Sequence, residues 1–597
     1  MKAEAMSLTF LGNEGQVRIP FFQRGYVWTI ENWEDILSDL LDFQKSHFLG
    51  SLILKQLERQ TGKPKEVLVI DGQQRLTTLS ILLRALFNSF DKEIKINCEA
   101  SLHNYLFYKQ NTTDKEYFVK ISHSKIDKKY FQNVIKNEIS EAEYDAISVE
   151  NPTTKTTSKS NRVMQCFKYF TEKMQDIALD YRLDLFNRLL DQENKILVMI
   201  DLSEKEDEQA IFDTINSAGV RLSSADIIKN ALFQKALDLF DKQEDVETLY
   251  KENWEGIFSV DDDAEIFWDT PRATGRLMRD NIEILLHSIS VIKGFFDPDK
   301  NTLSDLSNLY KIYIAKITKD NLKSFILEIS KYAKLFRDKI LVFNSSTLFN
   351  YQDNYSRLFH ILSVNEISTF HPYILSLFYK YDNNEIKLNE ELHKVESLII
   401  NRMITKSETK SYNKMCKEFI NKNAAIDQKL AEQSDNDIIN GLSNISNKNA
   451  NLLLFWVELY RRSQDSKQSV KELKYNYSLE HLMPQKWEEY WSNVDVYDMN
   501  SNIIIDREAA KKERYSKIYS IGNMTLLNSS LNTSLRNYEF TKKIEGEGRK
   551  RGIRHYADLG ITKFDILDNY DNDDKVWNEV KINQRTSSLA NDIMKIW

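Results

Sequence analysis

The sequence predicts a mainly helical, multidomain protein of the α+β class. With 597 residues, the chain is too long for a single hydrophobic core. The β-like runs "HFLGSLIL", "EVLVI" and "KILVMIDL" lie in the first third, between stretches with helical spacing. From about 235 to 430, apolar residues recur almost throughout at intervals of three and four. We therefore expect a mixed α/β domain over 1–235, a helical connecting domain over 236–450 and a further domain over 451–597.

Two polar stretches stand out between these patterns. "NPTTKTTSKSN", residues 151–161, is rich in threonine and predicts an exposed loop in the first domain. "SDNDIINGLSNISNKNAN", residues 434–451, is rich in Asn and Ser, although its Ile and Leu leave a short helix open. We place the boundary before the last domain near this second stretch.

The composition is that of a soluble globular protein, with 42% hydrophobic and 28% charged residues. No apolar run is long enough to span a membrane, and the N-terminus lacks the apolar core of a secretory signal, so we expect a cytoplasmic protein. Cys98, Cys166 and Cys416 lie far apart and form no CxxC pair. This argues against a disulfide framework or a cysteine zinc site and favours buried packing roles.

Charge is distributed unevenly along the chain. The formal net charge is −8, which argues mildly against a nucleic-acid partner. Between Arg507 and Arg554, however, twelve Lys or Arg residues stand against five Glu, a local net charge of +7. Such a segment could bind phosphates, or it could be an ordinary solvated helical face.

The stretch "VIDGQQRLTTLSILLRAL" predicts a buried strand that turns at Asp71-Gly72 directly into a helix. Glycine permits a tight turn, and the helix start presents unpaired N–H groups and its positive dipole end, which suit a phosphate. Gln73 and Gln74 could hydrogen-bond a base, a ribose or a phosphate, and the guanidinium of Arg75 matches phosphate oxygens in pairs. The alternative is that Asp-Gly serves turn geometry alone.

Two further stretches add to this pattern. "IPFFQRGYVW" places Gln23 and Arg24 between aromatic residues, which could stack on a base while Arg24 meets a phosphate. "AIFDTINSAGVRLSSADIIKN" joins a helix, a Gly-containing turn and a second helix start, where Ser223 or Ser224 can cap. An aromatic cluster can equally be core, and a capped helix needs no ligand. The chain contains neither a Walker A motif nor GxGxxG.

A second constellation lies near the C-terminus, where "YSLEHLMPQ" is followed by "SIGNMTLLNSSLNTSLRNYEFTKKI". A ββα-metal nuclease needs an unprotonated imidazole to activate water, a residue that orients it and metal ligands nearby. His481 suits the general base, and Asn523 could tie its loop to that base. Glu480 is the natural carboxylate ligand for Mg²⁺. A His beside a Glu is, seen alone, more often an ordinary pair.

The remaining candidates of this centre lie on the helix expected after the apolar run. Asn532 could hold the cation through its carbonyl oxygen, and Asn528 is a competing candidate. Lys543 could steady the scissile phosphate or be merely solvated. The tail "VWNEVKINQRTSSLANDIMKIW" has helical periodicity and is expected to pack this domain shut.

Together these motifs resemble the GmrSD-type modification-dependent (type IV) restriction enzymes. "IPFFQRGYVW", "FLGSLIL", "VIDGQQRLTTLSILL" and "FDTINSAGVRLSSADIIKN" resemble the N-terminal domain of that family, which is similar to the ParB and sulfiredoxin fold. "LEHLMPQ", "IGNMTLLNSSLN" and "FTKK" resemble its C-terminal HNH-like nuclease domain. The resemblance covers roughly 8–235 and 455–597. Asn532 stands where a strict His-Asn-His pattern has a third His, which puts the metal affinity in doubt.

The resemblance implies an NTP-binding and NTP-hydrolysing first domain and a metal-dependent, HNH-like nuclease as the last domain. The residues assigned to the nucleotide are Gln23, Arg24, Asp71, Gly72, Gln73, Gln74, Arg75, Asn216 and Lys229. Those assigned to the nuclease are His481, Asn523, Asn532 and Lys543, with Glu480 and Asn532 as ligands of a divalent metal, Mg²⁺ being the favoured ion.

The implied function is a nucleotide-regulated DNA endonuclease of antiphage defence that restricts modified or foreign double-stranded DNA. One alternative is a ParB-like DNA-binding regulatory NTPase without nuclease activity, and another is a toxin-like enzyme acting on RNA or nucleotides. The rings of Phe21, Phe22, Tyr26 and Trp28 are either readers of the DNA modification or core. An oligomer or a defence-system partner is left open.

Overall fold

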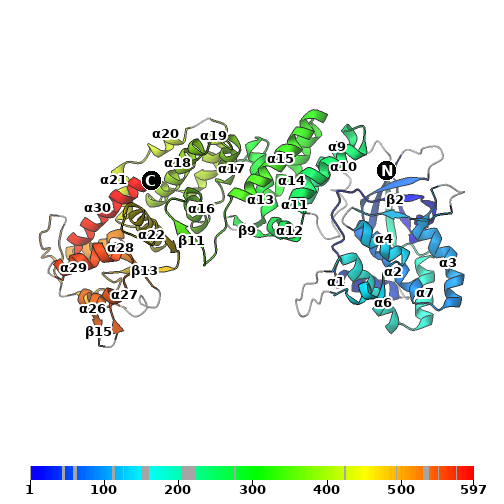
Figure 1. Ribbon diagram of the computed structural model, residues 1–597, viewed down its shortest axis with the longest axis horizontal. Coiled ribbons are helices and arrows are strands. Elements are labelled where there is room, and N and C mark those ends of the chain that lie inside the picture. Colours follow the sequence, from blue (N-terminus) through cyan, green and yellow to red (C-terminus); the bar gives the residue numbers. More distant parts are fainter. Residues whose placement is uncertain are drawn as a thin grey trace. The chain divides into compact units, whose positions relative to one another are not determined.

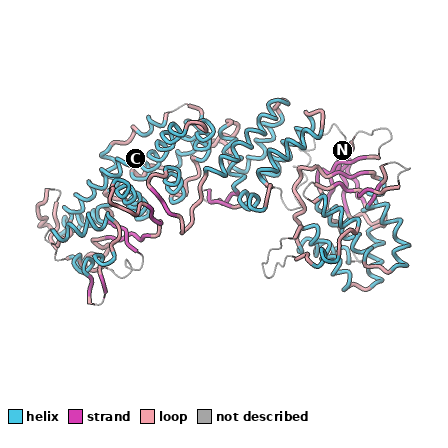
Figure 2. The backbone as a smooth tube through the Cα atoms, viewed as in Figure 1, coloured by secondary structure: helices cyan, strands magenta, loops and turns pink. Residues whose placement is uncertain are grey.

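The computed structural model describes residues 2–597 apart from a set of gaps. The undescribed residues are 43–46, 58–63, 111–114, 125–126, 150–159, 203–222, 275–276, 423–424, 493, 499, 529–536, 549 and 573–574. Packing divides the chain into two compact units. The first unit comprises Met1–Lys251 and Ile314–Leu322, and the second comprises Glu252–Tyr313 and Lys323–Trp597. Helices make up most of the described chain (Figure 2).

The first unit is built around a mixed six-stranded sheet (Figure 1). Its strands, in spatial order, are β1 (Lys2–Met6), β8 (Leu197–Leu202), β3 (Ser51–Gln56), β4 (Glu66–Asp71), β2 (Gln16–Arg18) and β7 (Ile121–Ser122). Strand β1 is antiparallel to β8 and β3 to β4, and the other neighbours are parallel. The three predicted β-like runs form β3, β4 and β8, so these strands are confirmed.

Helix α2 (Gln73–Asn88) begins immediately after β4 and lies at the centre of the first unit. Nearly every side chain from 73 to 86 is buried, because apolar residues occur on all faces of this helix. The helices around it are α3 (Lys92–Leu106), α4 (Lys128–Lys136), α6 (Arg162–Asp176) and α7 (Leu179–Leu189). Further helices of this unit are η1 (Leu8–Asn13), α1 (Ile30–Leu41), α5 (Glu141–Asp145), α9 (Ser224–Leu239) and α10 (Gln243–Tyr250). The strand-to-helix turn is therefore anchored in the core.

The following part of the chain is helical, as its periodicity predicts. Its helices are α11 (Gly256–Phe258), α12 (Asp262–Asp269), α13 (Asn281–Ile292), α14 (Leu306–Ala315), α15 (Lys319–Lys339), α16 (Asn354–Val364), α17 (His371–Lys380), α18 (Glu385–Ile404), α19 (Tyr412–Ile420), α20 (Ile426–Leu430) and α21 (Asp435–Leu442). Two short pairs of strands interrupt them: β9 (Pro271–Thr274) with β10 (Leu277–Asp280), and β11 (Leu348–Asn350) with β12 (Glu472–Lys474). Neither pair was predicted.

The C-terminal part of the second unit carries the other short strands. Its elements are α22 (Asn447–Gln464), β13 (Tyr477–His481), α23 (Glu488–Trp491), α24 (Arg507–Ile518), η5 (Ile521–Asn523), β14 (Met524–Asn528), α26 (Phe540–Glu545), β15 (Gly546–Glu547), β16 (Lys550–Arg551), α27 (Ile553–Tyr556), α28 (Gly560–Thr562), α29 (Asp568–Asn572) and α30 (Glu579–Ile596). Strands β13 and β14 are antiparallel, and α26 follows them in the chain. Helices α23 and α24 lie between the two strands in the chain, and the HNH fold stays a prediction.

Several expectations can be compared directly with these elements. The predicted C-terminal helix is α30, which packs against η5. Of the predicted loop, residues 151–159 lie outside the described part, and Asn161 caps α6. The boundaries predicted at 235/236 and 450/451 fall inside α9 and α22, because capped helices continue through both positions. A division into three domains stays a prediction.

Two predictions from composition also have structural counterparts. All three cysteines are free thiols, with Cys166 and Cys416 buried and Cys98 partly buried, as expected of packing residues. Among the described residues, no helix combines the length and apolar character needed to cross a membrane.

Candidate nucleotide and nuclease sites

The turn between β4 and α2 requires glycine at position 72. Gly72 has φ +93°, a left-handed conformation that L side chains rarely adopt. A Cβ atom there would lie 2.2 Å from Leu52 Cδ2. Arg75, one turn into α2, donates from Nη1 to the carbonyl of Ser51 at 3.1 Å, and its side chain fills the space beside Gly50. The turn is thus locked against the neighbouring strand β3.

The glutamines at this turn hold the "IPFFQRGYVW" segment in place. Gln73 Nε2 donates to the carbonyl of Arg24 at 2.9 Å. Gln74 Nε2 donates to Gly25 O at 3.1 Å, and its Oε1 accepts from Val27 N at 2.9 Å. Gln73 Oε1 is buried without a hydrogen-bond partner among the described residues, and it remains as an acceptor. These contacts assign the glutamines a structural role that the sequence did not indicate.

Gln23 makes the reciprocal contact from the segment back to the sheet. Its Nε2 donates to the carbonyls of Val69 and Ile70 at 3.0 and 3.3 Å. Two motifs that are far apart in the sequence are therefore joined by side-chain amides on both sides of the turn. This arrangement fixes the backbone on which Arg24 lies.

Charged groups gather beside the same turn. Arg24 lies near Asp71 and Asp226: burial lowers the pKa of Arg24, and both carboxylates act against that shift. Burial raises the pKa of Asp71, opposed by the Gly72 N–H and by Arg75 and Arg24. Lys229 Nζ pairs with Asp226 Oδ1 at 2.8 Å. Opposite charges are thus balanced in a partly buried network.

Asp226 is the member of this network that sequence reasoning did not select. Asp226 lies in the first turn of α9, three residues before Lys229. Its backbone N–H donates to the capping oxygen, Ser223 Oγ. The pKa of Asp226 is lowered because Lys229 and Arg24 outweigh its burial. An acid and a lysine at i and i+3 after a capping serine were the available signal. Asn216, also assigned to the nucleotide, lies outside the described residues.

The aromatic rings of the segment belong largely to the core. Phe22 is 2% exposed and packs against Phe233, with ring centroids 6.2 Å apart. The hydroxyl of Tyr26 bonds with Thr78 Oγ1 at 2.5 Å and accepts from Trp33 Nε1 at 2.8 Å. Of the two interpretations left open, core packing therefore holds for Phe22 and Tyr26. Phe21 and Trp28 are partly buried.

In the second unit, His481 is the last residue of β13 and pairs with Met524 of β14. Its neighbour Glu480 pairs with Thr525. Because successive side chains of a strand point to opposite faces, the imidazole and the carboxylate leave β13 on different sides. One ion could therefore not be held by both side chains in this conformation.

Lys543, on α26, is almost fully buried and joins the two residues. Its Nζ donates to Glu480 Oε1 at 2.5 Å and to the carbonyl of His481 at 2.6 Å. Burial lowers the pKa of Lys543, and Glu480 opposes that shift. Burial raises the pKa of Glu480, and Lys543 opposes it. The lysine is thus not simply solvated, which was one of its two predicted states.

His481 itself has an available ring nitrogen. Its Nε2 is buried and has no hydrogen-bond partner among the described residues. Burial, and secondarily the charge of Lys543, lower the pKa of His481 to about 4, so the imidazole is neutral at physiological pH. The ring of Tyr519 meets it edge-to-face at 5.9 Å, and Tyr519 is 41% exposed. A neutral imidazole with a free nitrogen can accept a proton.

Asn523 fastens the backbone that follows His481. Its Oδ1 accepts from Met483 N at 2.8 Å, and its Nδ2 donates to the carbonyls of Met483 and Ile518 at 2.9 and 3.0 Å. Its own carbonyl accepts from Leu482 N at 2.9 Å. Trp577 Nε1 also donates to Asn523 Oδ1 at 3.3 Å. The side chain is fully buried, so it positions the His481 loop from within, as its sequence position suggested.

Helix α30 secures the turn that carries Asn523. Arg585 Nη1 donates to the carbonyls of Gly522 and Met524 at 2.9 and 2.5 Å. Thr586 Oγ1 accepts from Gly522 N at 3.2 Å, and a Cβ atom at Gly522 would lie 2.2 Å from Ile582 O. Sequence reasoning treated this helix only as packing, because a contact across some 60 residues leaves no local signal.

Family models match the two parts of the chain that contain these residues. The model of the GmrSD restriction endonuclease N-terminal domain matches residues 8–233, which contain the strand-to-helix turn. The model of the GmrSD restriction endonuclease C-terminal domain matches residues 432–592, which contain Glu480, His481, Asn523 and Lys543. The chain belongs to the GmrSD restriction endonuclease family. The resemblance stated from the motifs is thereby confirmed.

A curated relative gives a weaker comparison. The Uncharacterized protein MJ0686 of Methanocaldococcus jannaschii is 22% identical over 264 residues, which is 38% of this chain and 41% of that protein. The match thus spans about two fifths of the length of this relative. The name of that protein states no activity.

Oxygen donors of the type that Mg²⁺ prefers are present at the GmrSD C-terminal site, but the set is incomplete in the described residues. No three His, Cys, Asp or Glu side chains of the described chain gather as a metal centre would require. Asn532 lies outside the described residues, and its competitor Asn528 is exposed at the end of β14. Glu480 has the right donor chemistry, but Lys543 engages its carboxylate.

The basic segment is only partly a surface feature. Arg514 is buried, and its Nε pairs with Glu579 at 2.9 Å. Lys543 is buried as described above, whereas Arg507 and Lys512 of α24 are exposed. The exposed members remain candidates for phosphate contacts in this family member.

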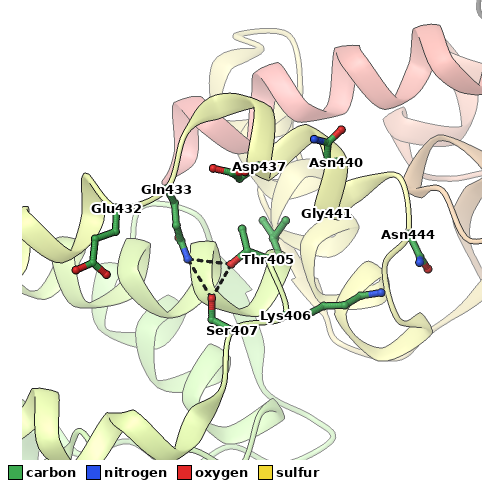
Figure 3. A pocket seen from close by; sticks show the side chains of 10 residues that line it. Thr405, Lys406, Ser407, Glu432, Gln433, Asp437, Asn440, Gly441 and Asn444 are labelled. Atoms are coloured by element: carbon green, nitrogen blue, oxygen red, sulfur yellow. Dashed lines mark hydrogen bonds between the residues drawn. The ribbon is translucent and has the colours of Figure 1, made fainter.

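A polar pocket of about 390 Å³ lies elsewhere in the second unit, between the end of α18 and helices α20 and α21 (Figure 3). Gln433 Nε2 donates into it to Thr405 Oγ1 at 2.8 Å and to Ser407 Oγ at 3.3 Å. None of the residues predicted for nucleotide binding or catalysis lines this pocket.

Proposed function

We propose that this chain is a metal-dependent DNA endonuclease of antiphage defence that restricts modified or foreign DNA under the control of a nucleotide. The observation that carries the proposal is His481: a neutral imidazole at a strand end, whose Nε2 has no partner among the described residues and whose following loop is fixed by the buried Asn523. It lies in the segment that matches the C-terminal domain of a restriction endonuclease family.

Each candidate residue of the second unit has its own role in the proposed hydrolysis of the phosphodiester. His481 Nε2 takes a proton from the attacking water, and its low pKa keeps it unprotonated. Asn523 positions the loop after the base through its hydrogen bonds to Met483. Glu480 and Asn532 would hold a divalent ion, Mg²⁺ in our proposal, which would stabilise charge on the phosphate oxygens. Because Glu480 and His481 leave β13 on opposite sides, the proposal requires the end of β13 to rearrange when the ion binds. Lys543 would then release the carboxylate and be available to steady the phosphate.

The first unit is proposed to bind and hydrolyse an NTP at the turn before α2. The positive end of α2, Arg24 and Arg75 suit the phosphates, and Gln73 Oε1 is an acceptor without a partner in the described chain. Asp226 and Lys229 complete a charged network that the arrival of phosphates would rearrange. Such a rearrangement supports a gate on the nuclease.

A second candidate function is a DNA-binding regulatory NTPase without nuclease activity. The observation in its favour is the Glu480–Lys543 pair, which leaves no free carboxylate beside His481 among the described residues. In that case Lys543 would be a structural residue and the imidazole would be dispensable.

Plasmid cleavage separates the two. The assay compares wild type with His481→Ala. His555→Ala, which removes an exposed histidine of α27, is the matched control. Each protein is assayed with Mg²⁺, with and without each NTP, on unmodified DNA and on a panel of modified DNAs. We expect cleavage by wild type and His555→Ala only, at a rate that depends on the nucleotide. Equal cleavage by His481→Ala, or NTP hydrolysis without cleavage of any DNA, would contradict the nuclease proposal.

A further inference from the structure

The β9–β10 hairpin follows α12 in the chain and precedes α13 (Figure 1). Its register places two arginines side by side. Arg272 lies directly opposite Arg279 in the antiparallel register. Like charges in this position repel each other, so each needs compensation. Arg279 has it, because its Nη1 pairs with Glu283 Oε2 at 3.4 Å.

Arg272 has no such partner among the described residues. Its Nε and Nη2 are both buried without a hydrogen-bond acceptor. Its Cζ lies 5.9 and 5.8 Å from the ring centroids of Phe267 and Phe336, a contact that leaves the N–H groups unpaired. Burial lowers the pKa of Arg272 to about 10, so the group is still charged at neutral pH. A buried cation without a counterion is costly to the fold.

The two unpaired nitrogens lie on the same edge of the guanidinium, and their N–H bonds point in the same direction. That edge matches two oxygens of a phosphate or carboxylate. His371, the first residue of α17, also has a buried Nδ1 without a partner in the described chain. Burial, and secondarily Arg272 and His287, lower the pKa of His371 to about 3, so the ring is neutral at neutral pH. In the tautomer that carries its proton on Nδ1, the ring can donate from that atom.

We propose that Arg272 and His371 form a phosphate-binding site, in which the Nε–Nη2 edge of Arg272 holds two phosphate oxygens and His371 Nδ1 donates to the anion. The phosphate belongs either to a DNA backbone or to a small phosphorylated ligand. The site is separate from the proposed nuclease centre and does not depend on it.

Thermal unfolding of the full chain with inorganic phosphate tests the site. The Tm of wild type is compared with that of Arg272→Met in phosphate and in chloride at equal ionic strength. Arg337→Met, which removes an exposed arginine of α15, is the control. We expect phosphate to raise the Tm of wild type and Arg337→Met by several degrees more than that of Arg272→Met. In chloride, Arg272→Met should be at least as stable as wild type, because an uncompensated buried charge is removed.

An equal phosphate response in all three proteins, or none in wild type, would overturn the proposal. If Arg272→Met does not fold, Arg272→Lys serves instead: it keeps the cation but loses the paired donors, and its phosphate shift should fall at least about twofold. Hydrogen exchange of 271–280 should change with phosphate in wild type but not in the variant; unchanged exchange in wild type would count against the site.

Duplex binding in EDTA, which prevents metal-dependent cleavage, identifies the source of the phosphate. If it is the DNA backbone, Arg272→Met should weaken binding about three- to tenfold and reduce the slope of log affinity against log salt by about one. If it is a small ligand, duplex affinity stays at the wild-type value while the loss of the phosphate response in Arg272→Met persists.

Discussion

The two predicted sites both stand where a strand ends, yet their polar groups are used differently. At the end of β4, the side-chain amides of Gln23, Gln73 and Gln74 donate to main-chain carbonyls and hold the "IPFFQRGYVW" segment against the turn. At the end of β13, the imidazole of His481 keeps a buried nitrogen without a partner in the described chain. Buried polar groups are normally paired. The first site keeps only an amide acceptor, Gln73 Oε1, without a partner in the described chain and is a scaffold for binding, whereas the second keeps a titratable ring nitrogen and is suited to proton transfer.

Removal of the His481 imidazole should have the largest effect of the variants proposed here, and the quantity it changes is the rate of DNA cleavage. His481→Ala is expected to lower the cleavage rate by about 10²- to 10⁴-fold, the usual contribution of a general base. Its Tm should stay near that of wild type, because no hydrogen bond of the ring is lost among the described contacts. Single-turnover plasmid cleavage and thermal unfolding check both parts; a large loss of Tm would make the residue structural.

Lys543→Met should give the largest loss of stability. It leaves Glu480 buried without its partner, which costs about 3–5 kcal/mol for a broken buried pair. The double variant Glu480→Gln, Lys543→Met removes both charges and should recover most of this loss. Denaturant unfolding of wild type, Glu480→Gln, Lys543→Met and the double variant measures the coupling. A double variant no more stable than Lys543→Met would show that the pair is not the cause.

Asn523→Ala should have an intermediate effect on stability and a clear effect on cleavage. The main cost is the buried Met483 N–H, which loses its acceptor, at about 1–3 kcal/mol; the carbonyls of Met483 and Ile518 each lose one donor. Cleavage should fall because the loop after His481 is no longer fixed, while duplex affinity stays unchanged. Loss of affinity without loss of rate would indicate a DNA contact instead.

Gln74→Ala extends the comparison to the first unit. The variant loses both hydrogen bonds to the Gly25–Val27 backbone, and we expect a cost of about 1–3 kcal/mol together with weaker NTP binding. Gln175→Ala, an exposed glutamine of α6, is the control and should lie within about 0.5 kcal/mol of wild type. If Gln74→Ala binds NTP as strongly as wild type, the hydrogen bonds of Gln74 to the Gly25–Val27 backbone are not needed for nucleotide binding.

The smallest expected effect is on the pH dependence of stability. Burial lowers the pKa of His360 to about 4, and its Nδ1 accepts from Trp456 Nε1 at 3.1 Å. His360 takes up a proton near pH 6.5 in the unfolded chain but only near pH 4 in the folded chain. Its contribution to the free energy of unfolding is therefore lost as the pH falls from about 6.5 towards 4. His360→Gln should flatten the fall in Tm across that window, and an unchanged fall would exclude His360 as a source.

Local pattern predicted the elements of both regions well. The β-like runs gave β3, β4 and β8, helical periodicity gave α30, and the position of Asn523 in a Gly-Asn turn indicated its hold on the His481 loop. What the pattern could not show depends on distant partners. Lys543 meets Glu480 across 63 residues, and Gln73 meets Arg24 across 49. Polar composition at 434–451 suggested a boundary, but serine caps start two helices there.

The central claim is that His481 is the general base of a nuclease, and chemical rescue tests it most directly. His481→Gly removes the ring and leaves space for free imidazole. We predict that the variant cleaves DNA negligibly with Mg²⁺ and that added imidazole restores part of the rate, with the pH dependence of imidazole itself. Undiminished cleavage by His481→Gly, or a folded, DNA-binding variant that imidazole does not rescue at any concentration, would contradict the account.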